Sequence, residues 1–116
     1  MAEPVYVVPY NPLWPSLFSL ERSHVEAVVG PWVETIEHIG GTAVPGLDAK
    51  PVIDLMVGMR NIRDADRCIR PLEEVGYSYR AEDPALDHHR LFVRFANPER
   101  TRRTHNLHVV EVGGEY

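Results

Sequence analysis

The residues best suited to chemistry in this sequence surround a short apolar run, PVIDLMV, at residues 51–57. Asp54 interrupts that run, although a carboxylate is disfavoured in a central strand unless it has a partner or a task. Strand alternation places Asp54 on one face and Ile53, Leu55 and Val57 on the other. Asp54 is therefore the first candidate catalytic residue, and the question is which side chains face it.

Two further runs with strand-like alternation supply candidate partners for Asp54. In residues 89–97 we assign one set of alternating residues to the core, namely Leu91, Val93 and Phe95. The predicted open face then gathers Asp54, Arg90, Arg94, Asn106 and His108. An imidazole exchanges protons near neutral pH, so His108 is the second candidate catalytic residue. The alternative is a solvated sheet face with a charge pair or two, because exposed strand arginines are common.

The glycine turn ahead of this strand is a candidate phosphate site. Glycine permits positive φ and lets a ligand approach the backbone, so Gly40, Gly41 and the Thr42 hydroxyl form a candidate cradle. Lys50 precedes Pro51, which favours extended backbone and aims the lysine at the same crevice. The alternatives are a plain tight turn and a strand-end lysine in water. His38 ends the preceding strand, where it either hydrogen-bonds the turn backbone or contacts a ligand.

The remaining histidines and the single cysteine are weaker candidates. His105 and His108 are three apart, so a strand places them on opposite faces and they cannot share a metal without a bulge. His24 is expected to be structural, and His88 and His89 are expected to be solvated. Cys68 lies on the apolar stripe of a predicted helix and is expected to be buried, which makes it a poor nucleophile.

The elements that position these residues follow from periodicity and caps. Residues 4–10 are predicted as an extended lead-in or edge strand, and 81–88 as a loop. Helices are expected at 11–31, with Asn11 as cap, and at 61–76, where Pro71 bends or shortens the helix. Strands are expected at 32–39, 51–57, 77–80, 89–97 and 106–112. The order predicts one α+β domain over residues 1–116, a small mixed sheet with helices on one face.

Composition limits the classes of partner. An apolar fraction of 44% and a charged fraction of 25% are ordinary for a soluble globular protein. The net charge of -5 argues against general nucleic-acid binding and against an anionic membrane surface. No apolar run approaches membrane length, no secretory segment is visible, and one cysteine excludes an internal disulfide. The protein is therefore expected to be cytoplasmic.

Three segments carry a family resemblance: YNPLWPSLF, EHIGGTAVPGLDAKPVIDLMV and LHVVEVGGEY. Together they resemble the GrpB family, which is placed in the nucleotidyltransferase superfamily. The superfamily signature is a Gly-Gly or Gly-Ser turn, then Asp-x-Asp/Glu on the next strand and a third acid on a neighbouring strand. Gly40, Gly41 and Asp54 fit the first two elements. Met56 stands where the second acid belongs, and His108 stands near the place of the third.

The resemblance implies a nucleotidyltransferase-fold protein that binds a nucleotide or a phosphorylated small molecule. In an enzyme, Asp54 would hold Mg²⁺ or Mn²⁺, the turn would cradle phosphate, and Lys50, Arg90 and Arg94 would neutralise it. The alternative, which Met56 favours, is a non-catalytic nucleotide-binding or partner module, linked to coenzyme A biosynthesis through relatives fused to dephospho-coenzyme A kinase. Family members continue past this sequence into a helical segment. We therefore expect a homo-oligomer or a partner chain to cover the surface against which that segment would pack.

Overall fold

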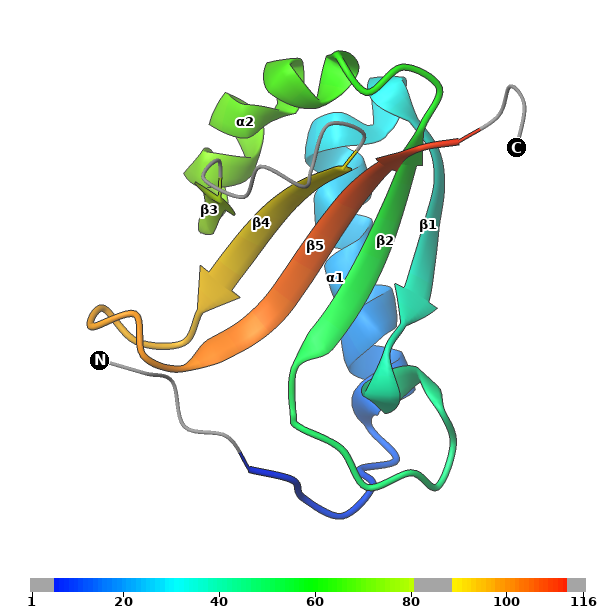
Figure 1. Ribbon diagram of the computed structural model, residues 1–116, viewed down its shortest axis with the longest axis vertical. Helices are drawn as coiled ribbons and strands as arrows, with labels where there is room; N and C mark the ends of the chain where they lie inside the picture. The colour runs from blue at the N-terminus through cyan, green and yellow to red at the C-terminus, as the bar shows by residue number, and fades with distance from the viewer. Residues whose placement is uncertain (1–5, 81–88, 113–116) are drawn as a thin grey trace.

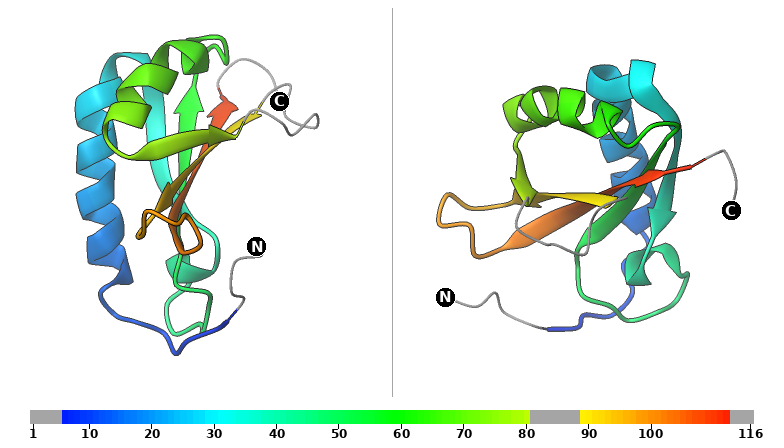
Figure 2. Two further views of the ribbon diagram at one scale, coloured as in Figure 1. Left: turned by 90° about the vertical axis from the view of Figure 1, so that its left-hand side faces the viewer. Right: turned by 45° about the horizontal axis from the view of Figure 1, so that its top comes forward.

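A five-stranded mixed sheet carries two helices on one of its faces (Figures 1 and 2). The computed structural model describes residues 6–80 and 89–112. The helices are α1 (Trp14–Val29) and α2 (Asp64–Glu74), and two short 3-10 turns are η1 (Gly30–Trp32) and η2 (Gly41–Ala43). The strands are β1 (Val33–Ile39), β2 (Ile53–Met59), β3 (Tyr77–Arg80), β4 (His89–Phe95) and β5 (Arg103–Glu111). The expected element order and the α+β class are confirmed.

The strand order across the sheet is β1-β2-β5-β4-β3. Strands β2 and β5 are parallel neighbours at its centre, and the other pairs are antiparallel. Both helices lie on the same side, as the left view of Figure 2 shows. Neither described helix covers the other side, which we call the open face. The fold therefore gives the two central strands one face in the core and one face where a ligand can approach.

Helix α1 begins after a turn that Asn11 stabilises. The Asn11 side chain accepts the Leu13 N–H at 2.9 Å, and the chain turns to helix at Trp14. The helix ends at Gly30, ahead of Pro31. Helix α2 runs through Pro71 to Glu74, so the proline does not end the helix. The predicted helices thus exist, and both are shorter at their starts than the sequence suggests, with Leu13 rather than Asn11 at the cap position of α1.

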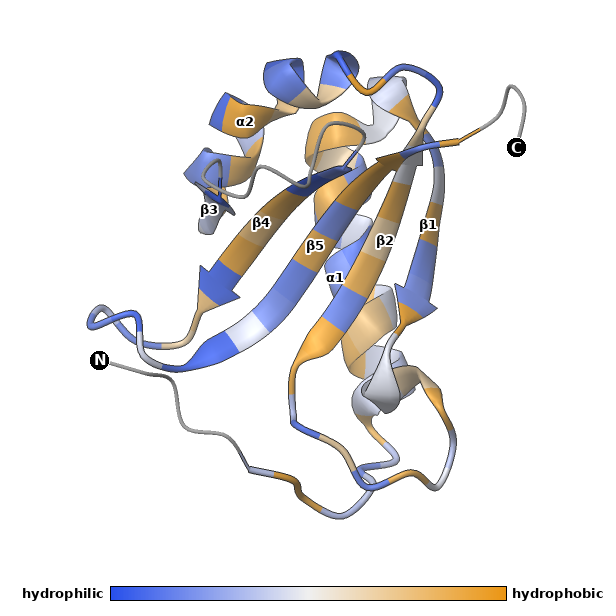
Figure 3. Ribbon diagram, in the orientation of Figure 1, coloured by the Kyte–Doolittle hydropathy of each residue, from blue (hydrophilic) through white to orange (hydrophobic). Residues whose placement is uncertain are grey.

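The core lies between the helices and the inner face of the sheet. Its centre consists of fully buried side chains from three neighbouring strands: Leu55, Val57, Phe92, Leu107 and Val109. Figure 3 shows that the first half of β5 is hydrophilic and that hydrophobic and hydrophilic residues alternate in its second half, as expected for a strand with one buried face. No described helix has the length and apolar character needed to cross a membrane.

The lead-in segment makes less structure than predicted. Within the described residues, Val8 forms a single bridge with Ala49 instead of a strand. The predicted loop at 81–88 lies outside the described residues.

Candidate functional site

Asp54 and His108 share the open face, as strand alternation predicts. They lie on the adjacent strands β2 and β5, where the register pairs Asp54 with Asn106 and Met56 with His108. The Asn106 amide donates to Asp54 Oδ1 at 2.9 Å, and His108 Nε2 lies 3.5 Å from the same oxygen. The Asp54 and His108 side chains are 22% and 27% exposed, so a ligand can reach both.

Two further side chains extend this contact along the open face. His89 on β4 places Nε2 3.1 Å from His108 Nδ1. Arg103 at the start of β5 donates from Nη1 to Asn106 Oδ1 at 3.0 Å. We call the resulting line of contacts the open-face row; its members are Arg103, Asn106, Asp54, His108 and His89. The row spans the three central strands and joins a carboxylate, two imidazoles, an amide and a guanidinium.

Sequence reasoning assigned no role in the site to Arg103 or His89. Arg103 lies three residues before Asn106, so alternation alone would place the two on opposite faces. An irregularity in the β4–β5 register, between Arg94 and Phe95, brings Arg103 opposite Phe95 and onto the open face. His89 was expected to be solvated, but its register position opposite Val110 makes it a diagonal neighbour of His108.

The open-face row has the parts needed to move a proton. A proton on His108 Nε2 faces the Asp54 carboxylate, and Nδ1 is then the acceptor for His89. A carboxylate beside an imidazole fixes its tautomer and its orientation. The arrangement can therefore act in general acid–base chemistry or bind an anion through a protonated imidazole.

Gly40, in the turn between β1 and β2, packs closely against Asp54. Its backbone has φ 77° and ψ -171°, a region open almost exclusively to glycine. A Cβ at this position would overlap Asp54 Oδ2 and lie 3.1 Å from Asp54 Cγ. The glycine is therefore required for the close approach of the turn to the carboxylate.

The other turn residues face inward. A Cβ on Gly41 would lie 2.9 Å from the Ala49 Cβ, so this glycine permits packing within the turn. The Thr42 side chain is buried, with its hydroxyl 2.9 Å from His38 Nε2 and 3.5 Å from the Val52 carbonyl oxygen. These contacts stabilise the turn from the helix side of the sheet.

His38 belongs to this inward-facing set. Its ring stacks on Phe18 of α1 with centroids 4.7 Å apart, and its Nε2 contacts the side chain of Thr42. Burial lowers the pKa of His38, and the nearby Asp54 charge opposes that effect only in part. A neutral imidazole that links α1 to the turn fits these contacts.

Lys50 lies between the turn and β2, four residues before Asp54. Its side chain is of intermediate exposure. Within residues 6–80 and 89–112, no carboxylate lies within ion-pair distance of its ammonium. Lys50 is thus a cation that remains available to an anionic ligand.

The predicted open-face position of Arg90 and Arg94 is wrong. Both side chains lie on the helix side: Arg90 Nε is 3.9 Å from Asp66 Oδ1 on α2, and Arg94 Nη1 is 3.2 Å from Glu21 Oε2 on α1. Phe92, between them, is fully buried in the core. From the sequence we assigned the alternating apolar residues of β4, Leu91, Val93 and Phe95, to the helix side. The acids on the helices allow the arginines to face that side instead.

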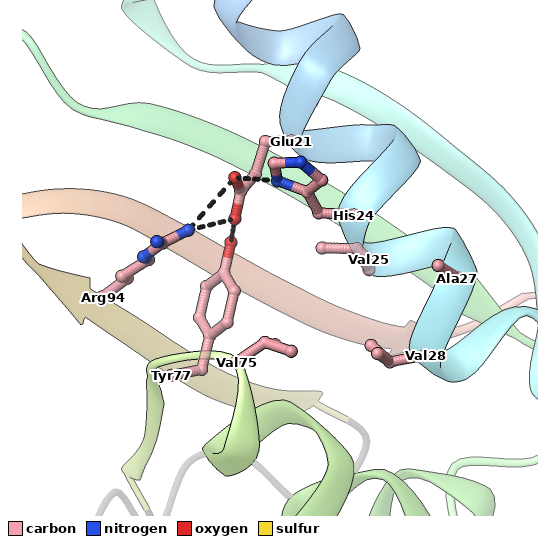
Figure 4. A pocket seen from close by; sticks show the side chains of 8 residues that line it. All are labelled: Glu21, His24, Val25, Ala27, Val28, Val75, Tyr77 and Arg94. Atoms are coloured by element: carbon pink, nitrogen blue, oxygen red, sulfur yellow. Dashed lines mark hydrogen bonds and ion pairs between the residues drawn. The ribbon is translucent and has the colours of Figure 1, made fainter.

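Glu21 is the buried acid that draws Arg94 inward. It accepts hydrogen bonds from the Tyr77 hydroxyl and from Arg94, and His24 Nδ1 lies 3.5 Å from Oε1 (Figure 4). His105 Nε2 lies 3.9 Å from the same oxygen. Sequence reasoning missed this cluster. The available signal was spacing, since Glu21 falls seven residues after Trp14 and four before Val25, on the buried stripe of α1.

The titration of the Glu21 cluster follows from burial and pairing. Burial raises the pKa of Glu21, but the Tyr77 hydrogen bond and the charges of His105 and Arg94 outweigh it, so the pKa falls below its ordinary value. Burial lowers the pKa of His105, against the attraction of Glu21. Burial and the bond to Glu21 raise the pKa of Tyr77. Glu21 and Arg94 therefore form an ion pair inside the helix–sheet interface, with Tyr77 and His105 beside it.

The donor set around Asp54 does not fit the two-metal site that the superfamily resemblance implies. Among the described residues, no group of three or more His, Cys, Asp or Glu side chains is arranged to hold a metal ion. Met56 offers no oxygen, and Asp54 Oδ1 already accepts the Asn106 amide. Magnesium prefers several oxygen ligands in octahedral geometry, which one shared carboxylate does not supply.

Apart from His89, the weaker candidates behave as expected where the structure describes them. His105 and His108 contact groups on opposite faces of β5. His24 lies on the outer side of the Glu21 cluster with 56% of its side chain exposed. Cys68 is fully buried, and burial raises its thiol pKa to about 11. His88 lies outside the described residues.

The fold and the open-face row together define a small α+β domain with a histidine–aspartate site on the uncovered face of a mixed sheet. The chain belongs to the GrpB family, because a family model described as GrpB protein matches residues 4–116. The sequence is 35% identical over 113 residues to the glutamate-rich protein GrpB of Alkalihalophilus pseudofirmus, covering 97% of this chain and 64% of that protein.

A solved structure and a second relative show the same likeness. A crystal structure of a conserved protein GrpB from Enterococcus faecalis superposes with a TM-score of 0.82 and 32% identity, covering 91% of this chain and 61% of that one. A protein of Mycolicibacterium paratuberculosis named dephospho-CoA kinase is 32% identical over 88 residues, covering 73% of this chain and 20% of that protein. The chain thus spans less than two thirds of the length of these relatives.

Proposed function

We propose that the protein binds a nucleotide or another phosphorylated small molecule on the open face of its sheet. The observation that carries the proposal is the open-face row, in which Asp54 holds His108 and His108 contacts His89. A few polar side chains that orient one another are the groups that fix the orientation of a ligand in a binding site.

The groups around the row suit an anionic ligand. Arg103 supplies a fixed positive charge within the row, and a phosphate takes charge-assisted hydrogen bonds from such a group. Lys50, four residues before Asp54, is the second cation that we expect to contact it. His108 and His89 add donors when they are protonated. Asp54 keeps His108 oriented, and we expect its carboxylate to accept a sugar hydroxyl, in the way carboxylates accept ribose hydroxyls elsewhere. Gly40 packs closely against this carboxylate.

The arrangement favours binding over metal-dependent nucleotidyl transfer. A two-metal mechanism needs several carboxylates around the ions. Met56 and His108 stand where the superfamily resemblance places the second and third acids, and the amide of Asn106 donates to Asp54. The enzyme alternative relies on His108, which would move a proton without a metal. Binding is therefore to be measured both with and without Mg²⁺ or Mn²⁺, so that metal-dependent nucleotidyl transfer is tested as well.

Coenzyme A precursors are the first ligands to test. The relative named dephospho-CoA kinase contains a segment similar to this chain, which makes up 20% of its length. Dephospho-coenzyme A carries both an adenosine and phosphates, so it joins the two ligand classes proposed here. Such molecules occur in the cytoplasm, the compartment that the cysteine content suggests.

The test is a calorimetric titration of nucleotides, dephospho-coenzyme A and phosphopantetheine into the protein, with and without Mg²⁺ or Mn²⁺. We expect saturable binding in EDTA by at least one ligand, and loss of that binding in His108→Asn. The matched control is His24→Asn, which changes an exposed histidine on the other side of the sheet. No binding by any ligand, or equal affinity in His108→Asn and wild type, would contradict the proposal. Binding that appears only with Mg²⁺ or Mn²⁺ would favour metal-dependent nucleotidyl transfer instead.

A further inference from the structure

A hollow on the helix side of the sheet is separate from the open-face row. It has a volume of about 320 Å³, which lies at the lower end of the range for ligand pockets. Its apolar wall comes from α1 and from the end of α2: Val25, Ala27, Val28 and Val75. Figure 4 shows these side chains beside the Glu21–Arg94 ion pair. We call this cavity the Val28 hollow.

The polar end of the Val28 hollow is made by Glu21, His24, Tyr77 and Arg94. Glu21 has little capacity left, because Tyr77 and Arg94 already donate to it. Arg94 donates only through Nη1 within the described residues, so its Nε and Nη2 hydrogens have no acceptor there. Its side chain is 38% exposed. The unused hydrogen-bonding capacity at this end is therefore that of a donor.

This unused capacity decides the charge of a suitable ligand. A ligand must accept hydrogen bonds from Arg94, and a carboxylate matches the planar guanidinium. The Glu21 carboxylate lies beside the same guanidinium, so a second single charge is tolerated better than the double charge of a phosphate monoester. The apolar wall requires that the rest of the ligand be a compact hydrocarbon body.

A neighbouring cavity of about 400 Å³ continues along α1 on the other side of the ion pair. It shares Glu21, His24 and Arg94 with the Val28 hollow, and Leu17 and Leu20 lie at its rim. We call it the Leu17 hollow. It is more open and carries more polar lining, including Thr104 and His105, so it suits an apolar body less well.

We propose that the Val28 hollow binds a small amphipathic carboxylate, with the carboxylate on Arg94 and the apolar body against Val25, Val28 and Val75. The site is independent of the proposed function, because Asp54 and His108 lie on the opposite face of the sheet.

The test uses 4-phenylbutyrate as probe in a ¹H–¹⁵N NMR titration of the intact protein. We expect saturable shifts at residues of α1 and β3 that line the hollow, and no shift at His108. The neutral amide of the same acid should bind about tenfold more weakly or not at all, because it lacks the charge that pairs with Arg94. Acetate should also fail to bind, because it lacks the apolar body.

Three variants locate the probe. Val28→Trp should fill the hollow and abolish binding, while Leu13→Trp, an exposed change immediately before the same helix, should leave affinity unchanged. Leu17→Trp should fill the Leu17 hollow and should also leave the affinity for the probe unchanged. Arg94→Lys keeps a positive charge beside Glu21 but loses the fork of donors, and should weaken binding about tenfold.

Several outcomes would overturn the proposal. They are the absence of saturable binding by folded wild type, equal binding of acid and amide, and binding that survives Val28→Trp. Loss of binding in Leu17→Trp with retention in Val28→Trp would assign the probe to the Leu17 hollow and would likewise overturn it. The NMR spectrum of each variant reports directly whether it is folded.

Discussion

His108 Nε2 lies 3.5 Å from Asp54 Oδ1, across the junction of the two parallel strands at the centre of the sheet. The Asn106 amide donates to the same carboxylate, and Gly40 packs closely against it. No arginine lies within ion-pair distance of Asp54 in the described part of the chain. The environment of Asp54 is therefore that of an oriented site residue rather than half of a buried ion pair.

Replacement of Asp54 tests this distinction. Asp54→Asn should keep the fold and lower the free energy of unfolding by only about 1 kcal/mol, because Asn106 retains an oxygen acceptor. It should abolish ligand binding at the open face, because His108 loses its orienting charge. Chemical denaturation and calorimetry measure both effects, and Asp66→Asn on α2 is the matched surface control. A loss of about 3–5 kcal/mol would instead indicate a buried charge left without its partner.

Gly40 should resist substitution more strongly than Gly46. Both have positive φ, but a Cβ on Gly46 meets nothing within 4 Å, whereas one on Gly40 overlaps Asp54. Gly46→Ala should cost about 1–2 kcal/mol of stability through backbone strain alone. Gly40→Ala should cost about 1 kcal/mol more and should weaken ligand binding. Equal costs in denaturation curves, with unchanged affinity, would show that the turn does not position Asp54.

Glu21 should make stability depend on acid pH. Its folded-state pKa is below the ordinary value of 4.5, so the unfolded chain takes up the proton first. Its contribution to stability is therefore complete above pH 4.5 and is lost as the pH falls through the folded-state pKa. Wild type should lose stability more steeply than Glu21→Gln in this range.

The same variant reports the strength of the ion pair at neutral pH. Glu21→Gln should lower the free energy of unfolding by about 2 kcal/mol, less than for a fully buried pair because Arg94 is 38% exposed. Urea denaturation at a series of pH values measures both effects. The control is Glu26→Gln, an exposed acid on the same helix. Parallel pH profiles for wild type and Glu21→Gln would rule out the proposed linkage.

Cys68 should be inert in the native protein. Burial, and then the charge of Asp64, raises the pKa of its thiol to about 11, while the thiolate is the reactive form. Reaction with a disulfide reagent at pH 8 should be about a hundredfold slower in the folded protein than in denaturant. Absorbance of the released thiol follows the rate. A native rate close to the denatured one would show that the α2–sheet interface opens readily.

The sequence by itself determined the element order and the placement of Asp54. Successive side chains of a strand point to opposite faces, and the apolar set takes the buried face. Alternation along residues 53–57 and 106–110 therefore put Asp54, Asn106 and His108 on the other face. The sequence also predicted the turn at Gly40, because glycine tolerates positive φ and Gly40 has φ of 77° in the structure. These features are local, and local patterns are what a sequence states directly.

Tertiary structure decided which face of β4 is covered. Alternation divides that strand into two sets but does not say which set meets the helices. Arg90 and Arg94 face inward because Asp66 and Glu21, on two different helices, are placed to pair with them. Arg103 and His89 join Asp54 and His108 only through the register of β4 against β5. Contacts between residues far apart in the chain follow from packing and register, which no local pattern contains.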